Sequence, residues 1–509
     1  MRPADEPEQS EEDSPNLLST KNREREESPM GNSTASAAAE AAMADIFTGM
    51  LMSGGLTFAS FERSALTEGH AIMARAMGRA LERLDAALCA ELPSGLSVHD
   101  VRERSLATVV GDVSFRWRRL RARGGGACVP LADELDLPWG ARVSPAAEEF
   151  LVEAGAEVSY AAAAGLLARA GGSRVSAKTV MAAVHAAGER CAEEDARAAR
   201  DLFDLGIKPG GRTAAAQVCV EADGTWVALQ GTAPGEPSKV EIKAMAAYSG
   251  KVVRGRKAAR ERCVRHGCAC APGEFWPEAV AAIGSEFDLS ALERVHLGTD
   301  GEGWCRRGGA YFPLRVEVVG HLDPFHVNRA LLSCFDDAAM GRRLVEVVND
   351  GGKEAAAALL EACIDMGLAR KGAPRVLAYL RRNADLIAVD GPSLGTMESE
   401  NQHLYKSRMA SVPCAWSRPG ASHMARLRSR RASGRAVPPR TRAGSATPLR
   451  RRRDEGRETA ALERRGLSAT GCPPRVGSGY EPSRASVASS SGEVRYAAAV
   501  DSGMAGTGW

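Results

Sequence analysis

Residues 217–227 read Gln217-Val218-Cys219-Val220-Glu221-Ala222-Asp223-Gly224-Thr225-Trp226-Val227, and this stretch decides which fold to expect. Its apolar, β-branched run predicts a buried strand that ends in an acid and a glycine, with Asp223 at the strand's end. A shorter segment of the same kind follows at residues 295–303, where Asp300 comes after an apolar run and before Gly301, which lets the backbone turn sharply. The sequence therefore predicts a carboxylate at the end of each of two strands.

A third acid lies in the stretch from Gly395 to His403. Thr396 is suited to cap a helix that presents Glu398 in its first turn. Glu400 lies two residues further on and would point about 200° away on a helix, so only one of the two can face a shared site. We favour Glu398 and keep Glu400 as the alternate.

Another acid competes with these positions. Asp323, in the stretch His321-Leu322-Asp323-Pro324-Phe325-His326, is an alternate ligand or else a structural acid that holds His326. His326 either positions DNA or satisfies a buried hydrogen bond.

Three converging carboxylates suit one kind of chemistry. Phosphodiester transfer must activate an attacking oxygen and stabilise a leaving one, and two divalent metal ions about 4 Å apart do both. Mg²⁺ and Mn²⁺ prefer hard oxygen ligands, so Asp223, Asp300 and Glu398 are the expected side chains for two such ions. If these three meet in space, we expect a metal-dependent enzyme that cuts DNA.

Several blocks of the chain resemble bacterial insertion-sequence transposases of the Lre type, formerly catalogued as an uncharacterised protein family, and more distantly the Mutator-like transposases. Their order and spacing over roughly residues 100 to 430 carry the resemblance. The blocks are Val220–Asp223, Glu241–Lys243 with Tyr248, Phe275-Trp276, Leu297–Gly301, Leu322–His326, Glu398 through Arg408-Met409, Trp416-Ser417 and Met424–Leu427. The resemblance implies an RNase H-like catalytic domain of the DDE transposase superfamily, with Asp223, Asp300 and Glu398 as its triad.

The patterning divides the chain into five parts. We expect a disordered leader over residues 1–40, a helical N-terminal region over 41–108, and a small strand pair plus a DNA-binding region over 109–205. The α/β RNase H-like domain would cover 206–430, with strands near 217–230, 239–253, 294–299 and 312–319 and a helical insertion about 327–390. Residues 431–509 are predicted to be a disordered basic tail.

The DNA-binding region contains three predicted helices, from Ser144 to Ala156, from Ser159 to Ala170 and from Ser176 to about Cys191. The short link between the last two has the proportions of a helix-turn-helix. Ser176 would cap the recognition helix, with Lys178 and Thr179 near the DNA. An ordinary helical hairpin is the competing interpretation.

Net charge limits how DNA could be bound. The formal charge is only +2 at pH 7, so binding must come from local clusters rather than from the whole molecule's field. One such cluster contains Arg254, Arg256 and Lys257, and Arg408 is a further predicted DNA contact. The predicted partners are element terminal repeats and target DNA, with a homo-oligomer forming on the DNA.

The 12 cysteines show no even framework, and no apolar signal or bilayer-spanning run is present. We therefore expect a cytoplasmic, nucleoid-associated bacterial protein that has no membrane partner. Cys263, His266, Cys268 and Cys270 invite a zinc interpretation, but their spacing is unusual, and free thiols in an irregular loop are favoured.

The sequence thus predicts a transposase that binds the ends of its element and catalyses strand cleavage and strand transfer. Two alternatives are an inactive DNA-binding remnant and an RNase H-like nuclease without strand joining. The composition changes abruptly beyond roughly Arg430, which motivates the remnant and also a frame-slip hypothesis for the tail.

Overall fold

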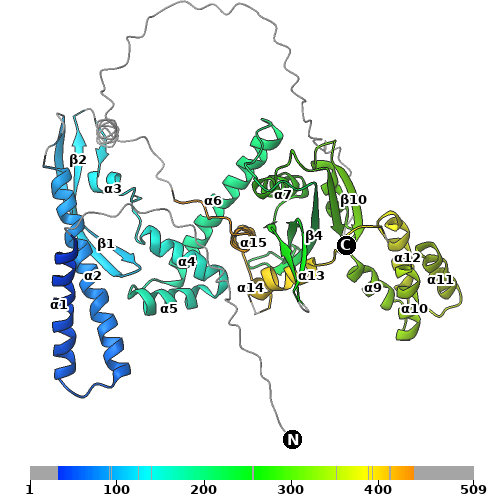
Figure 1. Cartoon of the computed structure of the whole chain (residues 1–509), viewed down its shortest axis with the longest axis horizontal. Coiled ribbons are helices and arrows are strands. Elements are labelled where there is room, and N and C mark those ends of the chain that lie inside the picture. The colour runs from blue at the N-terminus through cyan, green and yellow to red at the C-terminus, as the bar shows by residue number, and fades with distance from the viewer. Residues whose placement is uncertain are drawn as a thin grey trace, which may run out of the picture. The chain divides into compact units, whose positions relative to one another are not determined.

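The computed structural model describes residues 32–440 except 91, 93, 94, 124, 139, 255, 256, 351, 388, 393, 412 and 413. The chain separates into two compact units, one up to Ile72 and one from Met73 onward. Figure 1 labels their helices and strands. Most of the predicted leader and most of the predicted tail lie outside the described residues.

The first unit is a helical hairpin of α1 (Asn32–Met52) and the beginning of α2 (Phe58–Leu88). The turn between them uses Gly54 and Gly55 at φ values of 76° and 75°, a region that favours glycine. The rings of Phe47 and Phe61 pack edge to face with centroids 6.2 Å apart. Because α1 begins at Asn32, the prediction of a disordered leader through residue 40 was wrong over its last part.

The second unit begins with a three-stranded antiparallel sheet of β1 (Leu96–Thr108), β2 (Gly111–Ala122) and β3 (Ala127–Cys128), on which the end of α2 packs. The helical region predicted over 41–108 was wrong for β1. That strand is largely exposed and rich in charge, so it lacks the apolar alternation that identifies a strand, and its pairing with β2 defines it. The short helix α3 (Pro130–Glu134) follows.

Three helices follow in the predicted places: α4 (Pro145–Glu157), α5 (Tyr160–Gly171) and α6 (Ala177–Phe203). Each begins after a serine, Ser144, Ser159 or Ser176, whose side chain accepts a hydrogen bond from the backbone N–H three residues on. The third helix was predicted to end near Cys191, but α6 continues to Phe203. Its second half is buried against α7 and α15, a tertiary contact that no local pattern reports.

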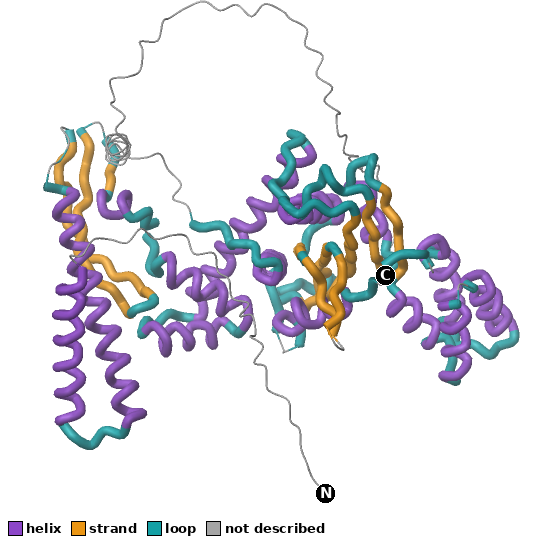
Figure 2. The backbone as a smooth tube through the Cα atoms, viewed as in Figure 1, coloured by secondary structure: helices purple, strands orange, loops and turns teal. Residues whose placement is uncertain are grey.

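A five-stranded mixed sheet in the order β10-β9-β4-β5-β8 is the largest sheet of the second unit. Figure 2 draws its strands in orange. Its strands are β4 (Gln217–Ala228), β5 (Lys239–Tyr248), β8 (Val264–Cys268), β9 (Arg294–Thr299) and β10 (Glu317–Leu322). Strands β4, β9 and β10 are mutually parallel, whereas β5 is antiparallel to both of its neighbours. The sheet therefore has one end at which three parallel strands finish together.

Strand predictions succeeded where an apolar run ended in a clear turn signal. Strand β9 matches its predicted range, whereas β10 begins at Glu317 rather than at 312. Strand β5 ends at Tyr248, and the chain then forms a separate hairpin of β6 (Gly250–Arg254) and β7 (Lys257–Glu261). Strand β8 was predicted as an irregular loop because its cysteine and histidine content hid its pairing with β5.

Helices cover both faces of the sheet. Val218, Val220 and Ala222 of β4 pack with α7 (Pro272–Glu286) in one core. Ile242 and Ala244 of β5 belong to a second core, shared with α4, α5, α6 and α15 (Arg418–Ala432). Because side chains alternate along a strand, Cys219, Glu221 and Asp223 lie on the face of β4 opposite to α7.

A helical insertion follows β10 and has a hydrophobic core of its own. It consists of α9 (Pro324–Leu332), α10 (Ala338–Asn349), α11 (Lys353–Asp365) and α12 (Ala373–Arg382), followed by the 3₁₀ helix η2 (Ala384–Leu386) (Figure 1). These bounds agree with the insertion expected about 327–390. The short α8 (Gly303–Arg306) and 3₁₀ helix η1 (Arg307–Tyr311) precede β10.

After the insertion the chain forms one continuous helical segment of α13 (Met397–Glu400), a π-helical turn η3 (Asn401–Lys406) and α14 (Ser407–Met409). π-helical turns recur at functional sites because they offset side chains that an α-helix would stack. Helix α15 and residues up to Arg440 then pack back on the unit: the carbonyl of Pro438 accepts a hydrogen bond from Arg190. The described part of the chain thus continues beyond the predicted boundary at 430.

Candidate functional site

Strand register sets three aspartates in one row. Ala222 of β4 pairs with Thr299 of β9, which in turn pairs with Leu322 of β10. The next residue on each strand is an aspartate: Asp223, Asp300 and Asp323. Adjacent strands are about 4.8 Å apart, so the three backbones are neighbours at the carboxyl end of the parallel strands. Ligands commonly bind at this edge of an α/β sheet.

Asp223 lies inside β4 rather than at its end, since β4 continues to Ala228. The residue nevertheless comes directly after the last β4–β9 pair, which explains the pattern that sequence analysis found. Its side chain accepts hydrogen bonds from the Gly224 N–H at 2.7 Å and from Asn401 Nδ2 at 2.7 Å. Burial raises the pKa of Asp223 to about 6, and the nearby Asp300 and Glu398 carboxylates add to the increase, while His326 and the Gly224 N–H oppose it.

Asp300 follows β9 and is half-buried. Its Oδ1 accepts a hydrogen bond from the Glu302 N–H at 2.8 Å, and its carbonyl accepts one from the Tyr379 hydroxyl at 2.9 Å. Tyr379 belongs to α12, so the insertion fixes the backbone of this acid. Burial, reinforced by the charge of Asp300, raises the pKa of Glu302.

Glu398 and Glu400 have different surroundings. A carboxylate oxygen of Glu398 lies within 4.8 Å of ligand atoms of Asp223 and His326, and Glu398 forms an ion pair with Lys406 at 3.3 Å. Glu400 is buried and ion-paired with Arg260 and Arg265, the latter at 2.8 Å. The arginines already neutralise Glu400, so the geometry favours Glu398 as the third acid.

Glu221 fixes the segment that carries Glu398. It is 2% exposed, and its carboxylate accepts hydrogen bonds from the Tyr248 hydroxyl at 2.6 Å, the Gly395 N–H at 2.6 Å, and the Thr396 N–H and hydroxyl at 2.7 and 2.5 Å. Thr396 was expected to cap the helix of Glu398, but its side chain makes no cap hydrogen bond and donates to Glu221 instead.

Sequence analysis assigned no role to Glu221 or Asn401. Glu221 is two residues before Asp223 on the same face of β4, and Asn401 is three residues after Glu398 on the same helical segment. These i+2 and i+3 spacings are the signals that would have found both residues.

Asp323 and His326 both belong to the beginning of α9. One Asp323 oxygen accepts a hydrogen bond from the Phe325 N–H at 2.8 Å, so this acid caps the helix. Burial raises the pKa of Asp323. His326 opposes this increase electrostatically, but the hydrogen bond between the two residues joins their backbones, so the alternative that Asp323 holds the His326 side chain stays a prediction.

The predicted DNA contacts fall into three groups. Lys178 is exposed in the first turn of α6, while the Ser176 and Thr179 side chains bond to each other at 2.9 Å. Arg256 and the side chains of Arg254 and Lys257 lie outside the described residues.

Arg408 was predicted to contact DNA, and the structure gives it an internal role instead. It donates to the Gly155 carbonyl at 3.2 Å, and its guanidinium lies over the rings of Trp416 and Tyr160 at 5.1 and 5.5 Å. We therefore remove Arg408 from the predicted DNA contacts.

A second acid-rich cluster lies where α6, α7, β8 and α15 meet. Arg426 contacts both Asp195 at 2.8 Å and Glu278 at 2.7 Å, and Arg430 contacts Asp195 at 2.6 Å. His266 lies 3.2 Å from Glu278. Burial alone would raise the pKa of Asp195, but neighbouring His266, Arg430 and Arg426 lower it to about 2.

The cysteines near this cluster were predicted to be free thiols. The structure instead joins Cys268 and Cys270 by a disulfide, while Cys263 remains free. His266, Cys268 and Glu278 have ligand atoms within 4.8 Å of one another. A cysteine in a disulfide offers no thiolate to a metal ion, and Arg426 already supplies a positive charge to Glu278, so both features disfavour a metal ion there.

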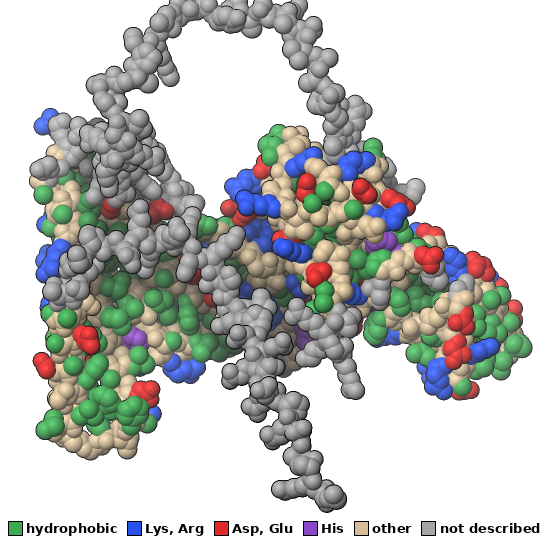
Figure 3. Space-filling view, viewed as in Figure 1, with side chains coloured by type: hydrophobic (Ala, Val, Ile, Leu, Met, Phe, Trp, Pro, Cys, Tyr) green, Lys and Arg blue, Asp and Glu red, His purple; other side chains and the backbone are tan. Residues whose placement is uncertain are grey.

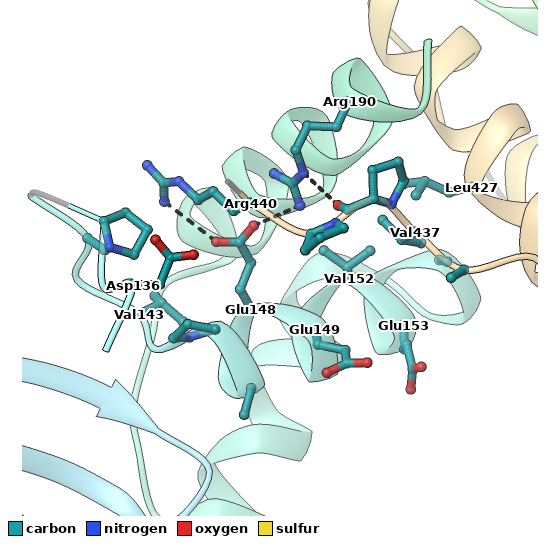
Figure 4. A pocket seen from close by; sticks show the side chains of 18 of the residues that line it. Asp136, Val143, Glu148, Glu149, Val152, Glu153, Arg190, Leu427, Val437 and Arg440 are labelled. Carbon is teal, nitrogen blue, oxygen red and sulfur yellow. Dashed lines mark hydrogen bonds and ion pairs between the residues drawn. The ribbon is translucent and has the colours of Figure 1, made fainter. Parts of the chain in front are cut away.

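The described residues also enclose a cavity of about 580 Å³, which is lined by α4 and by residues 427–440 (Figure 4). Glu148 at its wall pairs with Arg190 at 3.1 Å and Arg440 at 3.6 Å. None of the predicted acids lines it. Within the described part of the chain, no helix has the length and apolar character needed to cross a bilayer.

Fold and site together define an α/β protein with a carboxylate cluster at the end of its parallel strands. A family model described as "Uncharacterised protein family (UPF0236)" matches residues 51–440, and the chain belongs to that family. The match continues ten residues past the boundary predicted at 430. A similar protein is the "UPF0236 protein in vanSb 3'region" of Streptococcus gallolyticus, 22% identical over 380 residues, which are 70% of this chain and 79% of the relative.

Proposed function

We propose that the chain is a DDE-type transposase of a bacterial insertion sequence, with an RNase H-like catalytic domain. One observation carries the proposal: Asp223 of β4 and Asp300, the residue directly after β9, are neighbours at the end of the parallel strands, and Glu398 from a distant segment approaches Asp223 within 4.8 Å. The group of ligand atoms within 4.8 Å of one another contains Asp223, Glu398 and His326, while Asp300 acts on Asp223 through its charge. Among the described residues, no lysine or arginine pairs with Asp223 or Asp300 within 4 Å. Such a cluster of acids suits a divalent cation.

The residues fit Mg²⁺ or Mn²⁺ by two independent features. The raised pKa of Asp223 reports mutual repulsion and burial, both of which a cation would relieve. His326 Nε2 is also buried and has no hydrogen-bond partner among the described residues. Two divalent ions, when bound, would activate the attacking oxygen and stabilise the leaving one.

The chain's own residues would then have separate tasks. Asp223 and Asp300 would hold the ions, and Glu398 would complete one coordination shell and orient the attacking water. Asn401 fixes Asp223 by a hydrogen bond of 2.7 Å, and Glu221 fixes the backbone that leads to Glu398. Water would first hydrolyse one phosphodiester and leave a 3′-hydroxyl and a 5′-phosphate. The 3′-hydroxyl would then attack target DNA, and in that transesterification the phosphodiester that breaks is replaced by the one that forms, so no ATP is needed.

DNA binding is proposed for the α5–α6 pair, with Lys178 as an exposed cation in the first turn of α6. Figure 3 shows basic side chains over the central part of the visible face, interspersed with acidic ones. This mixture agrees with local phosphate contacts rather than with one extended basic surface. Synapsis of two element ends favours a homo-oligomer on DNA.

An assay of strand cleavage and strand transfer tests the proposal. It combines purified full-length protein with Mn²⁺ and with DNA that carries the element ends. We expect cleaved ends and joined products with the parent chain and neither product with Asp300→Ala. The control is Asp365→Ala, a change at an exposed acid of α11, which should give the same products as the parent chain. Cut but unjoined products would indicate a nuclease without strand joining. Binding without any cutting would indicate an inactive remnant and overturn the proposal.

The DNA-binding part has its own test. Lys178→Glu should weaken binding to all duplexes and reduce the salt slope by about one unit, because one phosphate contact is lost. The control is Lys371→Glu in the insertion, another exposed lysine. Equal slopes for the two variants would remove α6 from the DNA interface.

A further inference from the structure

His326 lies next to the acids without being satisfied by them. It occupies the first turn of α9, three residues after Asp323, at the point where β10 passes into the insertion. Its Nε2 is buried and has no hydrogen-bond partner among the described residues. A buried polar atom without a partner is unfavourable, so something other than these residues is expected to bind it.

The neighbours of His326 indicate what binds. One of its ring nitrogens and one oxygen each of Asp223 and Glu398 all lie within 4.8 Å of one another. Yet no hydrogen bond joins the ring to either acid in the described structure. Three donor atoms therefore surround one point from three elements: β4, α9 and α13.

Distances allow a shared ion after a small adjustment. Ligands of one ion at about 2.1 Å can lie no more than about 4.2 Å apart, so a separation of up to 4.8 Å requires shifts of some tenths of an ångström. Side-chain rotation supplies shifts of that size. A water molecule would satisfy Nε2 but would bring no positive charge to Asp223, whereas Glu398 already pairs with Lys406.

We propose that His326 is a nitrogen ligand of one metal ion in this site, so that the ion is held by two carboxylates and one imidazole. This inference rests on the metal site of the proposed function. Imidazole suits first-row transition ions better than Mg²⁺, so His326 would bias one position toward Mn²⁺. A purely oxygen-lined site has no such bias.

Other roles for His326 agree less well with the contacts. Because Nε2 is inaccessible, it cannot contact a DNA phosphate from the surface. Asp323 interacts with the ring electrostatically, but its side chain accepts a hydrogen bond from the Phe325 N–H, so it does not fix the ring by that hydrogen bond. A direct bond from a ring nitrogen of His326 to a metal ion agrees with both observations, the unpartnered Nε2 and the closeness of the ring to the two acids.

Pulsed electron paramagnetic resonance on Mn²⁺ bound to the full-length chain tests the inference without DNA or turnover. A coordinated imidazole couples its ¹⁴N to the electron spin, so we expect nitrogen modulation that changes when histidine is labelled with ¹⁵N. In His326→Gln the modulation should vanish and Mn²⁺ affinity should fall by about 10- to 100-fold, with a smaller loss for Mg²⁺. His403→Gln, an exposed histidine of η3, should behave like the parent chain.

Each outcome has a separate meaning. Modulation that survives Asp223→Asn would come from another site, such as the surroundings of His266, and would overturn the inference. Bound Mn²⁺ without nitrogen modulation in the parent chain would overturn it as well, while leaving the carboxylate site in place. If the parent chain binds no Mn²⁺, the proposed catalytic function fails together with it.

Discussion

Two acid clusters in the same unit differ in how their charge is compensated. Asp195 and Glu278 are buried against Arg426 and Arg430. The positive charge that balances these two acids is therefore part of the fold. Asp223 and Asp300 have no such partner among the described residues, and Glu398 has Lys406 at its exposed side. The first cluster is complete without a ligand, whereas the second calls for a cation from solution.

The largest effect is expected from a substitution in the cluster whose acids are paired with arginines. Arg426 is 5% exposed, and Arg426→Leu would leave two buried carboxylates undercompensated. We expect a loss of about 3–5 kcal/mol in the free energy of unfolding, measured by urea denaturation. Arg431→Leu on the same helix, whose side chain is about half exposed, should cost under about 1 kcal/mol. Similar losses for both variants would contradict a special role for Arg426.

The two clusters should also respond oppositely to pH. The pKa of Asp223 in the folded chain, about 6, lies above its usual 3.8, so its stabilising contribution is present below about pH 4 and is lost as pH rises through 6. The loss is on the order of 2–3 kcal/mol without metal. Asp195, with its pKa lowered to about 2, contributes stability above about pH 4 that is lost as pH falls through 2.

Urea denaturation from pH 4 to 8 in the presence of a chelator measures how the free energy of unfolding falls with pH because of Asp223. Asp223→Asn should remove it, because the amide does not titrate, and Mn²⁺ should reverse it in the parent chain by binding the ionised carboxylate. If the free energy of unfolding depended on pH equally in the parent chain and in Asp223→Asn, Asp223 would ionise as easily in the folded chain as in the unfolded chain.

Glu221 sharpens the comparison, because it is a buried acid compensated by neutral donors. Glu221→Gln weakens the hold on Gly395 and Thr396, so Glu398 should lose its fixed position. We expect Mn²⁺ affinity to fall by about 10- to 100-fold, as for other residues that orient ligands. Isothermal titration measures this change, with the exposed Glu317→Gln as control. Unchanged affinity would mean that Glu398 needs no such support.

The smallest effect concerns Lys406, the cation paired with Glu398. The pair is partly exposed, so Lys406→Gln should change the free energy of unfolding by under about 1 kcal/mol. Removing this competing charge should raise Mn²⁺ affinity by less than about fivefold. A marked decrease in affinity would instead assign Lys406 a supporting role in the site.

Sequence patterns predicted those elements whose signals are local. Strand β9 was predicted with its bounds because an apolar run passes directly into Asp300 and Gly301, and the three serine caps fixed the beginnings of α4, α5 and α6. Strand β1 was missed because it buries too little on either face to show alternation. The second half of α6 was missed because contacts with α15, over 200 residues later in the chain, stabilise it.

The site was predictable in its residue types but not in its roles. Three acids after strands or at a helix start suggested a metal cluster, and the register of β4, β9 and β10 brings two of them to one row with Asp323. Whether Glu398 or Glu400 faces that row depends on Arg260 and Arg265, which belong to a different part of the chain. No local pattern carries that information.

Helix α15 has a consequence for synthesis on the ribosome. Asp195 and Glu278 are translated long before Arg426 and Arg430, so the emerging chain holds two carboxylates that cannot yet be buried. We expect the unit to complete its folding only after α15 has left the exit tunnel. A premature stop codon before residue 426 should therefore yield a product that quality-control proteases remove, so that truncated copies do not compete with intact ones.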